Sequence, residues 1–219
     1  MTDGGRGIDG RGIDGRGIDG RGRDGRSTDI ESGQGVPGWI AANLNFCSRC
    51  GTELRFGATE GEDRDRSSCP SCGHVVYVNP RLVVTALPVT DDGRVVLIRR
   101  GIEPGLGAWA QPGGFLEVDE TVGEAAVRET LEETGLVIQP GEVIGFYTRL
   151  EAAVVVLVYE ARVVGGVPKP TPEALAVEAF EVDAIPWAGL AFKTTYWALV
   201  DWLERRHPTV RPPEFTAGR

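Results

Sequence analysis

One segment limits the possible folds of this chain more than any other: residues 114–136 read as a loop that leads into a short helix. Thr121 and Glu124 have the spacing of a capping box, which satisfies the free N–H groups at a helix start. Gly135 is expected to end the helix as a left-handed C-cap residue. The segment therefore predicts a helix of about three turns that is closed at both ends by its own sequence.

Three carboxylates of this helix, Glu129, Glu132 and Glu133, fall on one face at about 100° per residue. The packable opposite side is expected to come from Val127, Thr130, Leu131 and Thr134. Clustered anions repel one another, so a cation should offset them. Oxygen ligands with no His or Cys nearby favour Mg²⁺ or Mn²⁺ over zinc. The pattern predicts metal-assisted attack of water on a phosphorus centre, and the alternative is a solvated acidic helix without a metal.

The fixed positions of the segment resemble a known signature. Gly114, five residues, Glu120, seven residues and then Arg128-Glu129-x-x-Glu132-Glu133-x-Gly135-Leu136 are similar to the Nudix hydrolase motif. Thr130 departs from it, because the pattern usually has an aliphatic residue there.

This resemblance implies roles for individual residues. It implies catalysis that depends on Glu129, Glu132 and Glu133, which hold the metal together with the carbonyl of Gly113. It also implies that Arg128 and Glu120 brace the loop through an ion pair. The implied fold is α/β: a Nudix α/β/α sandwich around a mixed sheet, preceded by a small zinc ribbon.

The ribbon is predicted from the cysteines, which form two Cys-x-x-Cys-Gly turns: Cys47 with Cys50, and Cys69 with Cys72. Four thiolates close a tetrahedral shell, so the zinc should be structural. Disulfides are the competing interpretation, but no apolar signal segment precedes the cysteines, and a reducing, cytoplasmic location is expected. His74 is interpreted as a surface or packing residue.

The remaining chain divides into segments of different composition. Residues 1–35 repeat Gly-Arg-Gly-Ile-Asp and predict a disordered tail, because such a sequence cannot bury a core. The ribbon is placed at 44–78, the Nudix domain at 79–207 and a flexible tail at 208–219. Strands are expected at 81–89, 94–99, 143–148, 153–163 and 179–182, and a helix at 194–205, whose apolar face fits a core or a dimer contact.

The net charge and the residue composition argue against several classes of function. The net charge of −9 argues against nonspecific nucleic-acid binding, which needs a basic face. The longest apolar run, 152–159, is too short to span a membrane. With only two histidines, a Ser-His-Asp triad is not expected. The expected partner is a small-molecule nucleotide, and a homodimer is left open.

The substrate class follows from the resemblance together with the ribbon. Zinc-ribbon Nudix enzymes include NADH pyrophosphatases, but the motif that they carry after the helix is absent from 145–150 here. Stretches such as 112–117 and 172–175 look like the plant chloroplast-type FAD and ADP-ribose pyrophosphatases and their bacterial relatives. This implies cleavage of ADP-ribose or FAD to release AMP. The alternatives are an NADH pyrophosphatase, a nucleoside triphosphate hydrolase, or a non-catalytic ligand sensor or interaction module.

Residues that contact the substrate are harder to choose from sequence. Candidates for phosphate contacts are Arg99, Arg100 and Arg149. Candidates for the general base are Glu133, Glu173 and Glu178, with Glu133 or Glu178 favoured. The aromatic rings that can stack on a base are Trp109, Phe115 and Tyr147. Arg99, Arg149, Phe115 and Glu178 form the predicted substrate-binding set.

Overall fold

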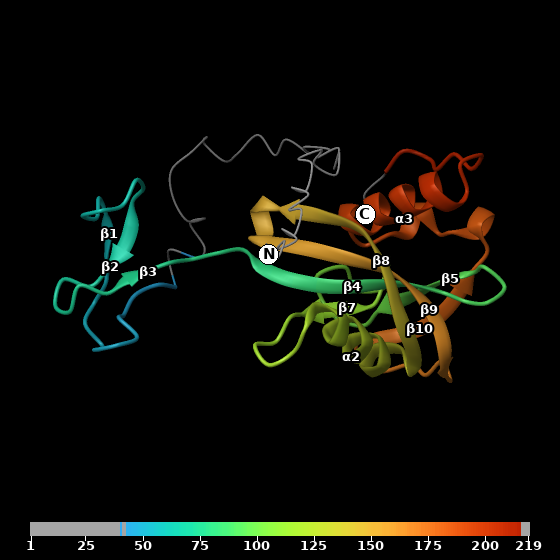
Figure 1. The fold of residues 1–219 in the computed structure, drawn as a ribbon, viewed down its shortest axis with the longest axis horizontal. Coiled ribbons are helices and arrows are strands. Elements are labelled where there is room, and N and C mark those ends of the chain that lie inside the picture. The colour runs from blue at the N-terminus through green and yellow to red at the C-terminus, as the bar shows by residue number, and fades with distance from the viewer. Residues whose placement is uncertain (1–39, 41–42, 216–219) are drawn as a thin grey trace, which may run out of the picture.

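The computed structural model describes residues 40 and 43–215, so the predicted disordered tail at 1–35 lies outside the described residues. The first folded unit is a small antiparallel sheet in the order β1-β2-β3, drawn apart from the main sheet in Figure 1. Its strands are β1 (Arg55–Gly57), β2 (Arg66–Ser68) and β3 (Val75–Val76). The four cysteines lie in the turns of this unit, as expected for a ribbon.

The second unit is built on a seven-stranded sheet with the path β10-β5-β4-β9-β8, to which β6 and β7 add at β5 and β4. The pairing of β4 with β9 is parallel and the other pairings are antiparallel, so the sheet is mixed. Its strands are β4 (Arg81–Val89), β5 (Val95–Arg100), β6 (Trp109–Ala110), β7 (Gly113–Phe115), β8 (Leu136–Arg149), β9 (Val154–Gly166) and β10 (Ala174–Phe180).

The two long helices, α2 (Val122–Thr134) and α3 (Lys193–Arg206), cover opposite faces of this sheet (Figure 1). Alternation along β4 explains the arrangement, because successive side chains of a strand point to opposite faces. Val84 and Ala86 pack in one apolar cluster with Ala125 of α2. Leu87 packs in the other cluster with α3. The expected α/β/α sandwich around a mixed sheet is confirmed.

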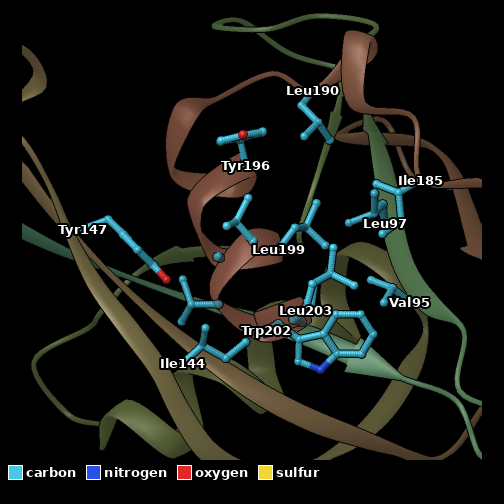
Figure 2. Packing of buried hydrophobic residues seen from close by; sticks show 14 of the residues in the cluster. Val95, Leu97, Ile144, Tyr147, Ile185, Leu190, Tyr196, Leu199, Trp202 and Leu203 are labelled. Carbon is cyan, nitrogen blue, oxygen red and sulfur yellow. The ribbon is translucent and has the colours of Figure 1, made fainter. Parts of the chain in front are cut away.

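The apolar face of α3 forms the centre of the larger cluster. Trp202 and Leu203 are 2% and 0% exposed, and Figure 2 shows them packed with Leu199 toward Val95 and Leu97 of β5. Burial of such large side chains is the main stabilising contribution of a helix of this length. The core interpretation of this face is therefore correct for Trp202 and Leu203. None of the described helices is long and apolar enough to cross a membrane.

The connections between these elements include three short 3₁₀ turns: Leu150–Ala152, Val182–Ala184 and Trp187–Gly189. The strand expected at 179–182 in fact begins at Ala174 and ends at Phe180, because pairing with β5 sets its length. Trp109, one of the candidate stacking rings, belongs to the short strand β6.

Two other expectations, the packed side of α2 and the chain after residue 207, also differ from the structure. Leu131, assigned to the packable side of α2, is 47% exposed, whereas Thr130 and Thr134 are fully buried. The stretch after 207 was expected to be flexible. Instead, Val210 and Phe215 pack against the α3 cluster, and the backbone carbonyl of Pro213 accepts a 2.8 Å hydrogen bond from the Tyr196 hydroxyl. Residues 216–219 are outside the described residues.

Candidate active site

The start and end of α2 are fixed as the sequence predicts. The Thr121 hydroxyl accepts from the Glu124 N–H, and the Glu124 carboxylate accepts from the Thr121 N–H at 2.8 Å. Gly135 adopts the left-handed conformation, with φ of 73°, and donates its N–H to the Leu131 carbonyl. The helix therefore presents its carboxylates at a defined rotation and height above the sheet.

The loop before α2 is held by Arg128. Its guanidinium donates to both oxygens of Glu120, at 2.6 and 2.9 Å, and to the Phe115 carbonyl at 3.2 Å. Glu120 also accepts the Glu117 N–H at 2.9 Å. The bonds from Arg128, then that N–H, lower the pKa of Glu120 to about 2. The expected ion pair between Arg128 and Glu120 is present and ties the loop to the helix.

Glu129 lies directly over the strand that precedes the loop. A Cβ on Gly114 would stand 2.3 Å from a Glu129 carboxylate oxygen, so only glycine allows this approach. Arg128 donates to Glu129 at 2.8 Å and to the more exposed Glu132 at 3.3 Å. One guanidinium thus links three of the acids that the motif brings together.

Glu133 is the buried member of the cluster, at 7% exposed. Its carboxylate accepts the Gly113 N–H at 2.8 Å, which places Gly113 beside it. Burial raises the pKa of Glu133 to about 7, against the opposing effect of the Gly113 N–H. Burial also raises the pKa of Glu129. Both shifts arise because negative charge is costly where water is excluded, so a cation here would lower that cost.

A cavity of about 240 Å³ opens beside these acids, and its lining joins α2 to the segment before β10. It is lined by Glu129, Glu132, Glu133, Thr171, Pro172 and Glu173. We call it the glutamate cleft. The three α2 carboxylates are not gathered as tightly as a bound ion would hold them, since in the described part of the chain only the cysteines form a cluster within 4.8 Å.

Thr171 and Pro172 were not predicted, and Glu173 was weighed only as a possible base. Their position depends on Gly101, whose N–H donates to the Glu173 carbonyl at 2.7 Å. A Cβ on Gly101 would meet the Pro172 carbonyl at 2.0 Å, so the two segments are in direct contact. No local sequence pattern reveals this contact, because it is made between β5 and the connection that follows β9.

Of the arginine candidates, Arg100 is not among the residues that line the cleft, but its charge interacts with two of the acids that do, Glu133 and Glu173. Burial lowers the pKa of its guanidinium, while the charges of Glu133, Glu173 and Glu103 oppose that effect. The guanidinium also lies over the Phe192 ring, 5.0 Å from its centroid, and donates to the Pro104 carbonyl at 2.8 Å. It is a half-buried cation that interacts electrostatically with the acids of the cleft.

The four residues predicted to contact substrate do not line the glutamate cleft. Arg99 is exposed and donates to the Gly107 carbonyl at 3.1 Å. Arg149 lies at the end of β8, where it pairs with Glu151. These two side chains are engaged elsewhere.

Phe115 and Glu178 also lie away from the cleft. Phe115 follows Gly114 along β7, so it points to the other face of the sheet, and the Arg81 guanidinium lies 4.1 Å from its ring centroid. Glu178 is exposed on β10, where it pairs with Leu97. Strand alternation and register decide both positions.

The other aromatic candidates are part of the core. Tyr147 is 9% exposed and donates to Asp201 at 2.7 Å. Trp109 makes an edge contact with Phe180, with centroids 5.0 Å apart. Neither ring offers a free stacking face to the cleft.

The cysteine cluster meets the requirements of a zinc site. The sulfur of Cys50 lies 3.5 Å from that of Cys69 and 3.6 Å from that of Cys72, and the Cys47 and Cys72 sulfurs are 3.7 Å apart. An ion about 2.3 Å from four sulfurs in a tetrahedron needs sulfurs about 3.8 Å apart. The cysteines are free thiols, so the disulfide alternative is not supported. His74 is not part of the cluster.

Family models match both units of the chain. The NUDIX domain model matches residues 79–203, and the model of the zinc ribbon described as Nudix N-terminal matches residues 45–78. A crystal structure of a NUDIX hydrolase from Nitrosomonas europaea is 33% identical, with a TM-score of 0.71. The alignment covers 80% of this chain and 98% of that one.

Two curated relatives carry functional names. The ADP-ribose pyrophosphatase of Methanocaldococcus jannaschii is 35% identical over 115 residues, which cover 51% of this chain and 68% of that protein. The NAD-capped RNA hydrolase NudC of Pseudomonas aeruginosa strain PAO1 is 30% identical over 150 residues, which cover 68% of this chain. The match spans about half of that relative's length, at 51%.

Proposed function

The chain belongs to the Nudix hydrolase family, and we propose that it hydrolyses the diphosphate bond of a nucleoside diphosphate linked to another moiety. The proposed substrates are ADP-ribose and FAD, with AMP as a product. The ADP-ribose pyrophosphatase of M. jannaschii supports the first substrate. FAD rests on the resemblance of this chain to the plant chloroplast-type enzymes.

The glutamate cleft is the main observation that supports this proposal. It combines three carboxylates from one helix with a fourth, Glu173, from the segment before β10. A protein that only binds a ligand has little reason to bury Glu133 at a cost to its own stability. The retained acids support an enzyme over a ligand sensor or interaction module.

The donor set of the cleft fits a hard divalent cation. Its charged lining is carboxylate, with no His or Cys among the lining residues, which suits Mg²⁺ or Mn²⁺. We propose Glu129, Glu132 and Glu133 as ligands, together with the Gly113 carbonyl. When bound, such ions neutralise diphosphate oxygens and increase the acidity of water. The four cysteines would hold structural zinc and take no part in the chemistry.

The proton of the attacking water needs an acceptor within hydrogen-bond reach. Glu133 and Glu173 line the cleft, and Glu178 does not, so we propose the base from the first two. Glu133 has a pKa near neutrality before any cation binds, which suits proton transfer. Glu173 faces the same cavity from the other side and keeps its carboxylate exposed.

We assign the phosphate contact to Arg100 in place of Arg99 and Arg149. A half-buried guanidinium opposite a group of acids can hold an anionic substrate after the cation has neutralised those acids. Its stacking on Phe192 and its bond to Pro104 fix its direction before the substrate arrives. A fixed direction reduces the entropy lost on binding.

The test is a comparison of kcat/KM for AMP release from ADP-ribose, FAD and NADH, in Mg²⁺ and separately in Mn²⁺. An NAD-capped RNA oligonucleotide is included, because relatives carry that name. We expect ADP-ribose or FAD to give the highest kcat/KM. A higher kcat/KM for NADH or for the capped RNA would identify that compound as the substrate instead. Absence of turnover with every compound would support the ligand-sensor alternative.

A further inference from the structure

A second cavity, of about 270 Å³, lies where the ribbon meets the Nudix domain. Its lining comes from four places: Ile40, residues 64–66 of the ribbon, the linker at 78–80, and residues 148–150 and 153–154 around the turn between β8 and β9. We call it the junction pocket. It shares no lining residue with the glutamate cleft.

The two cavities adjoin different strand ends of the main sheet. The cleft adjoins the start of β10, and the junction pocket adjoins the end of β8, which are the two outer strands of the path β10-β5-β4-β9-β8. Since they share no lining residue, they are treated as separate sites.

The charge of the junction pocket is opposite to that of the cleft and of the whole chain. Its charged lining residues are Arg64, Arg66, Arg149 and a single acid, Asp65, although the net charge of the protein is −9. An arginine-rich cavity in an acidic protein attracts anions to one place.

Two of these arginines are held in position and still have donors to offer. Arg66 uses its Nε to bond Glu62 at 3.2 Å and lies over the Tyr77 ring, and Arg149 uses its Nε to bond Glu151. A guanidinium has five N–H donors, so within the described residues the Nη groups of both are left for a ligand. Arg64 is exposed, with no ion-pair partner among the residues that the structure describes.

Most of the remaining lining is apolar, from Ile40, Val78, Pro80, Leu150, Ala153 and Val154, and two neutral polar residues, Asn79 and Thr148, complete it. Leu150 is 63% exposed, an uncovered apolar side chain at the mouth of a basic pocket. A volume of about 270 Å³ is enough to enclose a ligand of the size of one nucleotide. Fixed guanidinium groups favour a phosphate, and the apolar wall favours a base or a similar flat group.

We propose that the junction pocket binds a phosphate-bearing small molecule of the size of a nucleoside monophosphate. The phosphate lies against Arg64, Arg66 and Arg149, and the base lies against the apolar wall. Because the contacts come from both units, the ligand links the ribbon to the Nudix domain. This site does not depend on the proposed hydrolase activity.

The test is calorimetric titration of the full-length, zinc-loaded protein without Mg²⁺ or Mn²⁺, so that the acidic cleft repels the probe. The probes are AMP, ribose 5-phosphate and inorganic phosphate. AMP is expected to bind at one site per chain and more tightly than the other two. Arg64→Ala and Arg149→Ala are each expected to weaken AMP binding about tenfold or more, since each removes a charge-assisted contact.

Arg94→Ala is the matched control, because Arg94 also pairs with an acid two residues away but lies in the β4–β5 turn. It should leave binding unchanged, as should Glu133→Gln. Arg64 is exposed, so its variant is expected to fold even if the Arg149 variant does not. No AMP binding up to millimolar concentration, or binding that both arginine variants retain, would overturn the site. Equal affinity for phosphate and AMP would overturn the mononucleotide assignment.

Discussion

Replacement of Glu133 by glutamine is expected to stabilise the metal-free protein while it removes activity. In the folded protein, burial raises the pKa of Glu133 from the ordinary value of 4.5 to about 7. The folded state therefore holds a proton between these values that the unfolded chain has lost, and stability falls as pH rises from about 4.5 to 7. One pKa unit corresponds to about 1.4 kcal/mol, so the full loss is about 3 kcal/mol.

The glutamine side chain has the same shape, carries no charge and can still accept the Gly113 N–H. At pH 8 and without Mg²⁺, Glu133→Gln should therefore exceed the wild type by up to about 3 kcal/mol, or about 6–12 °C in Tm for a chain of this size. At pH 4.5 the difference should nearly vanish, because the wild-type carboxyl is then neutral. Addition of Mg²⁺ at pH 8 should stabilise the wild type more than the variant.

Urea and thermal unfolding at both pH values measure these differences, with zinc retained in the buffer. Glu132→Gln is the matched control, since its side chain is 59% exposed. Because little of that side chain is buried, no comparable gain in stability is expected at pH 8. A Glu133→Gln variant that is no more stable than the wild type at pH 8, or whose advantage is equal at both pH values, would refute the reasoning.

Three further predictions concern the cleft and the ribbon. Gly114→Ala should reduce turnover by a hundredfold or more, because its Cβ would stand 2.3 Å from a carboxylate oxygen of Glu129. Gly123→Ala is the control: its Cβ would meet nothing within 4 Å, so full activity is expected. Steady-state kinetics on both variants test this. Arg100→Ala should lower kcat/KM by about 10- to 100-fold through loss of a charged phosphate contact, and Arg99→Ala should change it little, as measured with ADP-ribose. Removal of zinc by a chelator should unfold residues 45–78, seen as lost protection from hydrogen exchange, and one equivalent of zinc per chain should be released.

Local features of the site could be predicted from sequence because their causes lie within one turn of helix or one loop. The capping box of Thr121 and Glu124, the αL cap at Gly135 and the ion pair of Arg128 with Glu120 depend on short spacings. The cluster of four cysteines follows in the same way from two repeated turns.

The residues around the cleft could not be predicted in this way. Arg99 and Arg100 are adjacent, and only the register of β5 decides which one interacts with the acids. Glu173 lines the cleft in place of Glu178 because the backbone contact of Gly101 fixes the loop before β10. These positions depend on strand pairing between distant parts of the chain, which hydrophobic pattern alone does not specify.

The exposure of Leu131 has a related cause. The rotation of α2 about its axis is set by the small residues Ala125 and Ala126, which let the helix approach the sheet closely. That rotation buries Glu133 and turns Leu131 outward, although the leucine is the more apolar of the two. The acid that we propose as a metal ligand is buried here at the expense of an apolar contact.

The most direct test of the account is the rate of AMP formation from ADP-ribose in Mg²⁺, measured for the wild type and for Glu133→Gln. The wild type is expected to turn over ADP-ribose, and the variant, whose fold is retained, is expected to be at least a hundredfold slower. Turnover that survives the substitution would contradict the assignment of the glutamate cleft as the active site.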